Sequence, residues 1–143
     1  MILTYEDAKE EDLCLLFAFN KDLIDRYEDV ASIDYDQVLA WVKQNLTASL
    51  PHFRRVLADG QLAAFYCLSP SDSNWELDSL FVLPPFQRKG IGTEILKKCI
   101  QDSSGKLFLY VFRKNTGAVT LYERMGFRVR QTLPTRYILE YPN

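Results

Sequence analysis

The amino-terminal half of the chain combines short apolar runs with two stretches of helical periodicity. Apolar side chains recur at helical spacing over residues 13–24, behind a run of acids that favours a helix start. The same spacing recurs over residues 38–46, and residues 32–36 are suited to capping that second helix. The pattern therefore predicts two amphipathic helices, each with one face directed to a core.

Strands surround these two helices in the prediction. Residues 2–5 read as a short opening strand, and residues 55–58 and 61–67 read as a β-hairpin. Asp59-Gly60 joins the hairpin, because this dipeptide readily takes the positive φ angles of a tight turn.

The second half alternates strands and helices. Residues 75–83 form a strand that Pro84-Pro85 ends, and residues 106–112 form a nearly continuous apolar strand, typical of a position covered on both faces. The remaining elements are a helix over Gly90–Ser103, a short helix that Asn115 caps and Gly126 ends, and closing strands over Phe127–Gln131 and Arg136–Glu140. The order β-α-α-β-β-β-α-β-α-β-β predicts an α+β domain in which helices cover a mixed sheet.

Composition is that of a globular protein with one domain. The 143 residues are 48% hydrophobic and 25% charged, which fits a single core. No apolar run approaches the roughly 18 residues of a membrane span, and acids such as Glu6 and Glu10 argue against a signal peptide. Cys14, Cys67 and Cys99 lack metal-ligand spacing, so we expect no metal site, reduced thiols that act as small hydrophobes, and a cytoplasmic location.

The net charge of −2 conceals an asymmetry between the halves. Residues 1–72 hold 13 acids and 6 bases, a charge of −7, whereas residues 73–143 hold 6 acids and 11 bases, a charge of +5. An acidic first half argues against a nucleic-acid binder. The basic second half suits a polyanionic small molecule, although an unevenly charged, solvated surface explains it equally well.

One segment of the basic half has the pattern of an anion-binding turn. Residues 82–93 contain a strand end, the bases Arg88 and Lys89, two glycines and then a helix start. The unpaired N–H groups of a helix N-terminus bind phosphate well, and glycines let an anion approach the backbone. The pattern is not the dinucleotide fingerprint, because Ile95 stands where a third glycine is expected, and no Gly-Lys-Ser/Thr of a nucleotide P-loop follows.

Two motifs resemble those of the GNAT (Gcn5-related N-acetyltransferase) superfamily. Gln87-Arg-Lys-Gly-Ile-Gly92 is similar to its Gln/Arg-x-x-Gly-x-Gly/Ala motif, and the segment from Asn115 to Phe127 is similar to its Asn-x-x-Ala-x-x-x-Tyr-x-x-x-Gly-Phe segment. The close resemblance covers residues 73–131, and the first 72 residues agree in element order only. It implies one GNAT acyl-CoA N-acyltransferase domain over residues 1–143, with six to seven strands and about four helices.

The resemblance also implies a binding mode for acetyl-coenzyme A, which would lie where the strands at 75–83 and 106–112 splay apart. The pyrophosphate would be wrapped by the backbone of Arg88, Lys89, Gly90, Ile91, Gly92 and Thr93. Backbone groups of Leu80 and Val82 would pair with the pantetheine arm as with an added strand, and Asn115 would hydrogen-bond the cofactor.

Tyr122 falls at the superfamily's tyrosine position and is the expected acid for the departing thiolate. The alternative is a tyrosine packed against the sheet with its hydroxyl bonded to backbone. Glu76 and Asp78 are the candidate bases, because their spacing puts both on one face of a strand. The alternative is an ordinary solvent-facing pair of acids. No Cys-His or Ser-His pair stands at a motif, so direct attack by the amine on the thioester is expected.

The acceptor amine would be selected by the first half of the chain. Residues 20–36 hold six acids against two bases, with Tyr27 and Tyr35 among them, which suits a small cationic amine such as a polyamine, an aminoglycoside or a basic peptide end. A solvated loop between helices is the alternative. A protein N-acetyltransferase and an inactive coenzyme A sensor also stay open, as does a homodimer. His52 stands outside both motifs and is not expected to act.

Overall fold

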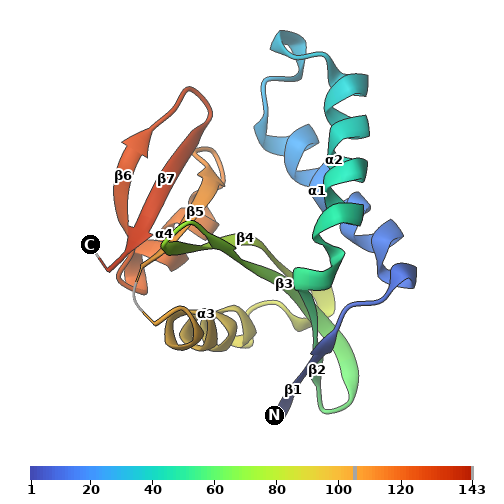
Figure 1. The fold of residues 1–143 in the computed structure, drawn as a ribbon, viewed down its shortest axis with the longest axis vertical. Coiled ribbons are helices and arrows are strands. Elements are labelled where there is room, and N and C mark those ends of the chain that lie inside the picture. Colours follow the sequence, from blue (N-terminus) through green and yellow to red (C-terminus); the bar gives the residue numbers. More distant parts are fainter. Residues whose placement is uncertain (105, 143) are drawn as a thin grey trace.

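The computed structural model describes residues 1–104 and 106–142 and contains one seven-stranded sheet (Figure 1). The strands are β1 (Leu3–Asp7), β2 (Phe53–Ala58), β3 (Gln61–Ser71), β4 (Asn74–Val82), β5 (Leu107–Phe112), β6 (Arg128–Thr132) and β7 (Arg136–Tyr141). The helices are α1 (Leu13–Tyr27), α2 (Tyr35–Ser49), α3 (Ile91–Asp102) and α4 (Thr116–Arg124). Element order, strand number and helix number agree with the prediction from the sequence.

The sheet order is β1-β2-β3-β4-β5-β7-β6, and every neighbouring pair is antiparallel except β4 and β5. The crossover from β4 through α3 to β5 makes this one pair parallel, as a strand-helix-strand unit requires. Asp59 and Gly60 both have positive φ at the β2–β3 turn, as the hairpin pattern predicts.

Each face of the sheet carries its own core. Helices α1 and α2 cover one face through Leu16, Ile24, Val42 and Leu46, which pack with buried phenylalanines of the strands. Helices α3 and α4 cover the other face, where Ile91, Ile95, Leu96, Cys99 and Tyr122 join a second buried cluster. Burial of both faces explains why the amphipathic helices face the sheet, since each apolar stripe leaves water there.

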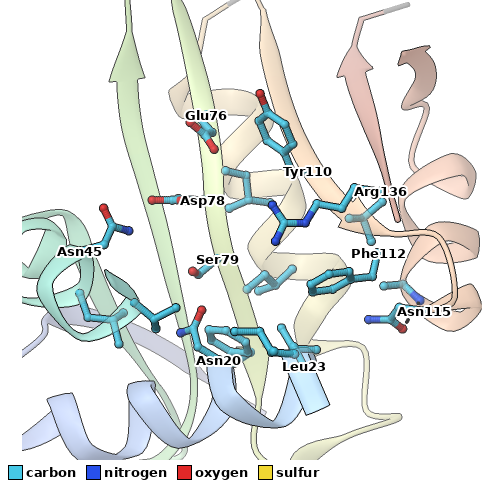
Figure 2. Close-up of a pocket in the computed structure, with 18 of the residues that line it drawn as sticks. Asn20, Leu23, Asn45, Glu76, Asp78, Ser79, Tyr110, Phe112, Asn115 and Arg136 are labelled. Carbon is cyan, nitrogen blue, oxygen red and sulfur yellow. Dashed lines mark hydrogen bonds between the residues drawn. The ribbon is translucent and has the colours of Figure 1, made fainter. Parts of the chain in front are cut away.

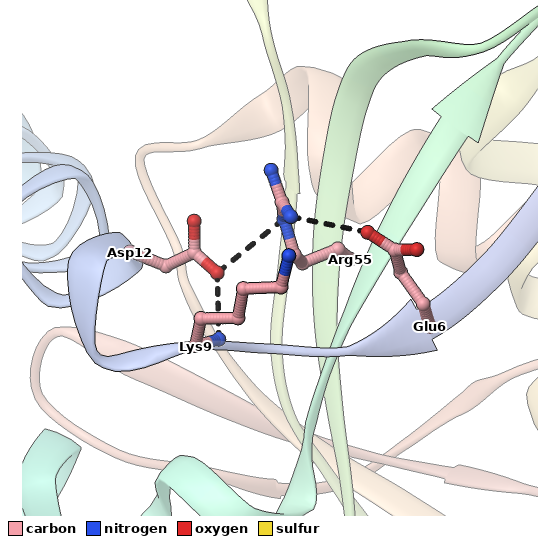
Figure 3. Close-up of polar contacts among 4 residues, drawn as sticks. All are labelled: Glu6, Lys9, Asp12 and Arg55. Carbon is pink, nitrogen blue, oxygen red and sulfur yellow. Dashed lines mark hydrogen bonds and ion pairs between the residues drawn. The ribbon is translucent and has the colours of Figure 1, made fainter.

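A polar cluster fixes the start of α1 against the sheet (Figure 3). The buried carboxylate of Asp12 accepts a hydrogen bond from the Lys9 backbone N–H at 2.8 Å. Arg55 of β2 lies between Asp12, with its Nε 3.4 Å from the Asp12 carboxylate, and Glu6 of β1, whose carboxylate accepts a hydrogen bond at 3.0 Å. The cluster therefore connects β1 and β2 to the start of α1.

The prediction for β5 was wrong in one respect. Its apolar sequence indicated a strand covered on both faces, but Tyr110 is 47% exposed. Tyr110 lines a cavity that lies between β5 and the pair α1 and α2, so the ring closes a cavity rather than filling a core.

Candidate active site

The site begins where the two parallel strands separate. β4 and β5 pair only at Trp75 with Leu107 and at Glu76 with Phe108, although β4 continues to Val82 and β5 to Phe112. The expected splay is therefore present. A cavity of about 430 Å³ occupies this region, with walls from α1, α2, α4, β4, β5 and β7.

A bulge in β4 lies beside the cavity. The register with β3 shifts between Cys67 and Leu68, so Asp78 has no partner of its own in that ladder. A bulge interrupts the alternation of side chains along a strand. Glu76, Asp78 and Ser79 all line the cavity, and so does Leu77, although Leu77 is also part of the buried core that α3 covers.

The two candidate bases share this cavity (Figure 2). Burial raises the pKa of Glu76, and the negative charge of Asp78 raises it further. Asp78 is open to the cavity, yet the surrounding protein displaces enough water to raise its pKa as well. A carboxylate with a raised pKa is a stronger base than an ordinary one, which suits proton removal from an amine.

Tyr122 of α4 lines the same cavity as the two acids. Its side chain packs edge-on against Phe127, with 5.8 Å between ring centroids, which fixes the ring. Burial raises the pKa of its hydroxyl, so the phenol keeps its proton at neutral pH. Within the described residues the hydroxyl has no hydrogen-bond partner, unlike the backbone-bonded tyrosine considered as the alternative.

The N-terminus of α3 presents a row of unpaired amides. Among residues 1–104 and 106–142, no acceptor is bonded to the backbone N–H groups of residues 88–93; the first bond of the helix runs from the Glu94 N–H to the Gly90 carbonyl at 3.1 Å. Arg88 and Gly90 have φ of 62° and 81°, which turns the chain sharply from β4 into α3. Free amides, the helix dipole and the exposed Arg88 and Lys89 favour an anion there.

The structure separates the roles of the two glycines in this turn. Gly90 has a positive φ that favours glycine, and a side chain there would meet open space. Gly92 has an ordinary helical φ, and a Cβ would lie 3.6 Å from Leu121 in normal contact. The contacts of the protein itself therefore do not require glycine at position 92.

Two other predicted contacts have protein partners already. The Val82 carbonyl accepts a hydrogen bond from Gln87 Nε2 at 3.0 Å, which leaves one lone pair for a ligand. The Asn115 side-chain oxygen accepts from the Ala118 N–H at 3.4 Å and caps α4, so its NH2 group is the part available to a ligand. Asn115 and Leu80 both line the cavity.

The acids of residues 20–36 do not line the cavity, which corrects the predicted acidic entrance. Asp25 pairs with Lys21 at 2.8 Å and accepts from Tyr35 at 2.6 Å, and Asp34 caps α2. These two carboxylates therefore interact with nearby residues of α1 and α2 and do not face the cavity. The negative charge of the cavity comes from Glu76 and Asp78 instead.

Sequence reasoning missed several residues of the cavity wall. Arg136 of β7 reaches into it, and Asn20, Asn45 and Tyr110 line it (Figure 2). Trp41 lines it as well. Arg136 was noted only as the first residue of a closing strand. Nothing local in the sequence marks these side chains, because four different elements bring them together.

His52 and the three cysteines, which are not expected to take part in the chemistry, do not line this cavity. His52 lines a separate cavity of about 350 Å³ beside Arg54 and Lys98. Cys67 and Cys99 are buried, and burial raises the pKa of each thiol to about 12. Cys14 is exposed, so the expectation that it packs as a hydrophobe was wrong.

The described residues contain neither a candidate membrane span nor a candidate metal site. No helix among them is both long and apolar enough to cross a membrane. The described part of the chain also brings together no group of three His, Cys, Asp or Glu side chains that could hold a metal ion.

Comparison with protein families matches residues 16–127 to the Acetyltransferase (GNAT) family. The chain belongs to this family. A GNAT structure, the PaiA N-acetyltransferase from Thermoplasma acidophilum in complex with coenzyme A, has a TM-score of 0.70 and 22% identity over 98% of both chains. The α+β fold with its seven-stranded sheet is thus a GNAT fold, as the sequence motifs indicated.

Curated GNAT relatives match over shorter segments. The [ribosomal protein bS18]-alanine N-acetyltransferase of Salmonella typhimurium is 32% identical over 51% of this chain and 52% of its own. The spermine/spermidine N(1)-acetyltransferase of Bacillus subtilis is 35% identical over 36% of this chain and 38% of its own. The matched segments span about half or less of these relatives.

Proposed function

We propose that this GNAT protein transfers an acetyl group from acetyl-coenzyme A to the primary amine of a small molecule. The observation that carries the proposal is the gap between β4 and β5, which opens into the cavity that Glu76, Asp78 and Tyr122 share. The free amides before and within the first turn of α3 support binding of the coenzyme A pyrophosphate, and Gly92 leaves room for its close approach.

Each step of the reaction has a group suited to it. Bound acetyl-coenzyme A supplies an activated acyl group and a thiolate leaving group. Glu76 or Asp78 takes a proton from the ammonium, directly or through water, so that the neutral nitrogen can attack the thioester carbonyl carbon. As the carbon–sulfur bond breaks, the Tyr122 hydroxyl gives its proton to the sulfur, and the second proton that the nitrogen loses as the amide forms returns through water to the phenolate. The products are the N-acetylated amine and free coenzyme A.

The two carboxylates also support an acceptor that arrives as a cation at its reacting end. Glu76 and Asp78 attract an ammonium and then accept its proton, so binding and activation use the same groups. The match to a relative named as a ribosomal-protein alanine N-acetyltransferase favours a peptide α-amine as the second candidate acceptor.

The direct test measures thiol release from acetyl-coenzyme A with a panel of small primary amines and short peptides with free N-termini. We expect release with at least one class of small amine, and no release when the amine is already acetylated. Release with peptides alone would favour the second candidate. No release with any amine, in a protein that binds acetyl-coenzyme A, would contradict the acetyltransferase proposal.

A further inference from the structure

Arg136 brings a positive charge into a cavity whose other charged side chains are carboxylates. It lies at the start of β7, and Figure 2 shows its side chain reaching toward β4, between Tyr110 and Phe112. No ion pair joins Arg136 to Glu76 or Asp78 in the part of the chain that the structure describes. The opposite charges thus occupy separate parts of one cavity.

The guanidinium is held in place but keeps its hydrogen-bonding capacity. It lies over the Phe112 ring, 4.8 Å from the centroid, and 3.6 Å from the Glu28 carboxylate at the end of α1. The second distance is too long for a hydrogen bond, and no acceptor among residues 1–104 and 106–142 is bonded to this guanidinium. A guanidinium has five N–H donors in a planar fork, so most of its donors are available to a ligand.

We propose that the acceptor of this enzyme is zwitterionic, with an oxyanion that Arg136 binds while its ammonium lies at Glu76 and Asp78. The inference rests on the proposed acetyltransferase function. The planar fork of arginine matches a carboxylate in bidentate geometry, and a phosphate offers the same oxygen chemistry. An amino-acid-like small molecule therefore fits the cavity better than a polyamine, whose distal ammonium would meet the charge of Arg136.

Glu28 makes the proposal testable, because it competes with the acceptor for the same guanidinium. Its side chain is only 14% exposed, and Arg136 is its one ion-pair partner in the described residues. If Arg136 is a ligand-binding residue, removal of the Glu28 charge frees it and strengthens binding of an anionic acceptor. If the Arg136–Glu28 pair only holds the cavity walls together, loss of either partner has the same damaging effect.

The experiment measures kcat/KM by thiol release for four sets of primary amines of matched length: amino acids, their primary amides, diamines and aminoalkyl phosphates. We expect the wild type to prefer the amino acids or the aminoalkyl phosphates, and the comparison of these two sets identifies the oxyanion. Arg136→Gln is expected to lower kcat/KM for the anionic acceptors by about 10- to 100-fold through KM, and to change that for the amides little.

Glu28→Gln is the matched control. We expect it to leave kcat unchanged and to lower KM for the anionic acceptors by about twofold to tenfold, opposite in sign to Arg136→Gln. Acetyl-coenzyme A affinity, measured by calorimetry, should be the same in both variants and the wild type, since neither residue lies at the α3 turn.

Three outcomes overturn the inference while the acetyltransferase function stands. They are a wild-type preference for diamines or amides, an unchanged acceptor preference in Arg136→Gln, and an equal loss for every acceptor in both variants. No thiol release with any amine, despite acetyl-coenzyme A binding, overturns the proposed function and the inference with it.

Discussion

Tyr122 is the residue on which the proposed chemistry depends most directly. Its ring packs against Phe127, its side chain lines the cavity, and burial keeps the phenol protonated. We expect Tyr122→Phe to lower kcat by about 100-fold or more, since a positioned general acid contributes that much. Thiol release under saturating substrates measures the effect.

Acetyl-coenzyme A affinity is the control for this substitution, because the ring remains in place without its hydroxyl. Calorimetry should give the same dissociation constant for Tyr122→Phe and the wild type. A variant that turns over at nearly the wild-type rate would remove Tyr122 from the mechanism and leave it as a packing residue.

The raised pKa values of Glu76 and Asp78 predict the pH dependence of turnover. A carboxylate must be ionised to accept a proton, so kcat/KM should fall on the acid side with an apparent pKa above the ordinary carboxyl values of 4.5 and 3.8. Substitution of the base that acts, by Glu76→Gln or Asp78→Asn, should remove this acid limb and lower kcat about 100-fold. An acid limb that both variants retain would assign it to another group.

The same shifts predict a stability effect with a definite sign. Because the pKa of each carboxyl is raised in the folded state, the protonated carboxyl favours folding. This contribution to stability is full below the pKa of the unfolded state and is lost as the pH rises through the pKa of the folded state. Asp78→Asn should therefore increase the free energy of unfolding near pH ~7 and change it little near pH ~3. Urea unfolding at the two pH values measures this, and a loss of stability at neutral pH would contradict the assigned burial cost.

At the scale of elements, the turn from β4 into α3 should bind the cofactor through its backbone. The methyl group of Gly92→Ala would make only ordinary van der Waals contacts within the protein, so the unfolding temperature of this variant should stay near that of the wild type. The added methyl group intrudes where the pyrophosphate should approach, and Gly92→Val intrudes further. We expect affinity for acetyl-coenzyme A to fall in that order, by about tenfold or more for Val. Equal affinities across the series would place the pyrophosphate elsewhere.

The buried cluster around Asp12 at the start of α1 should contribute more to stability than the exposed Asp7–Arg54 ion pair. Asp12 is buried and contacts both Arg55 and the Lys9 N–H, whereas Asp7 pairs with Arg54 at 3.0 Å with its side chain 84% exposed. We expect Asp12→Ala to lower the free energy of unfolding by about 2–3 kcal/mol and Asp7→Ala by less than about 0.5 kcal/mol. Chemical denaturation compares the two, and similar losses would contradict the anchoring role.

For the whole molecule, the elements that depend on local sequence patterns could be predicted from the sequence. Helical spacing in residues 13–24, the Asp59-Gly60 turn and the Asn115 cap each depend on neighbours in the chain, and the structure has all three elements. The splay of β4 and β5 was predicted from the family resemblance, and the register confirms it.

Long-range geometry accounts for what the sequence did not predict. The bulge at Asp78 depends on the pairing of β4 with β3, and it lies in the part of β4 that lines the cavity. Arg136 enters the site because β7 lies beside β5, which no local pattern reveals. The role of Asp25 was misread for a related reason, since one of its partners, Tyr35, lies ten residues further along the chain at the start of α2.

The proposed binding of coenzyme A depends above all on the free amides at the start of α3. Nuclear magnetic resonance of the backbone amides tests it directly in a protein of 16.6 kDa. On titration with coenzyme A, we expect the N–H signals of residues 89–93 to shift more than those of any other segment, because these amides gain a charged acceptor. Signals of residues 89–93 that stay in place while the ligand binds and shifts another segment would contradict it.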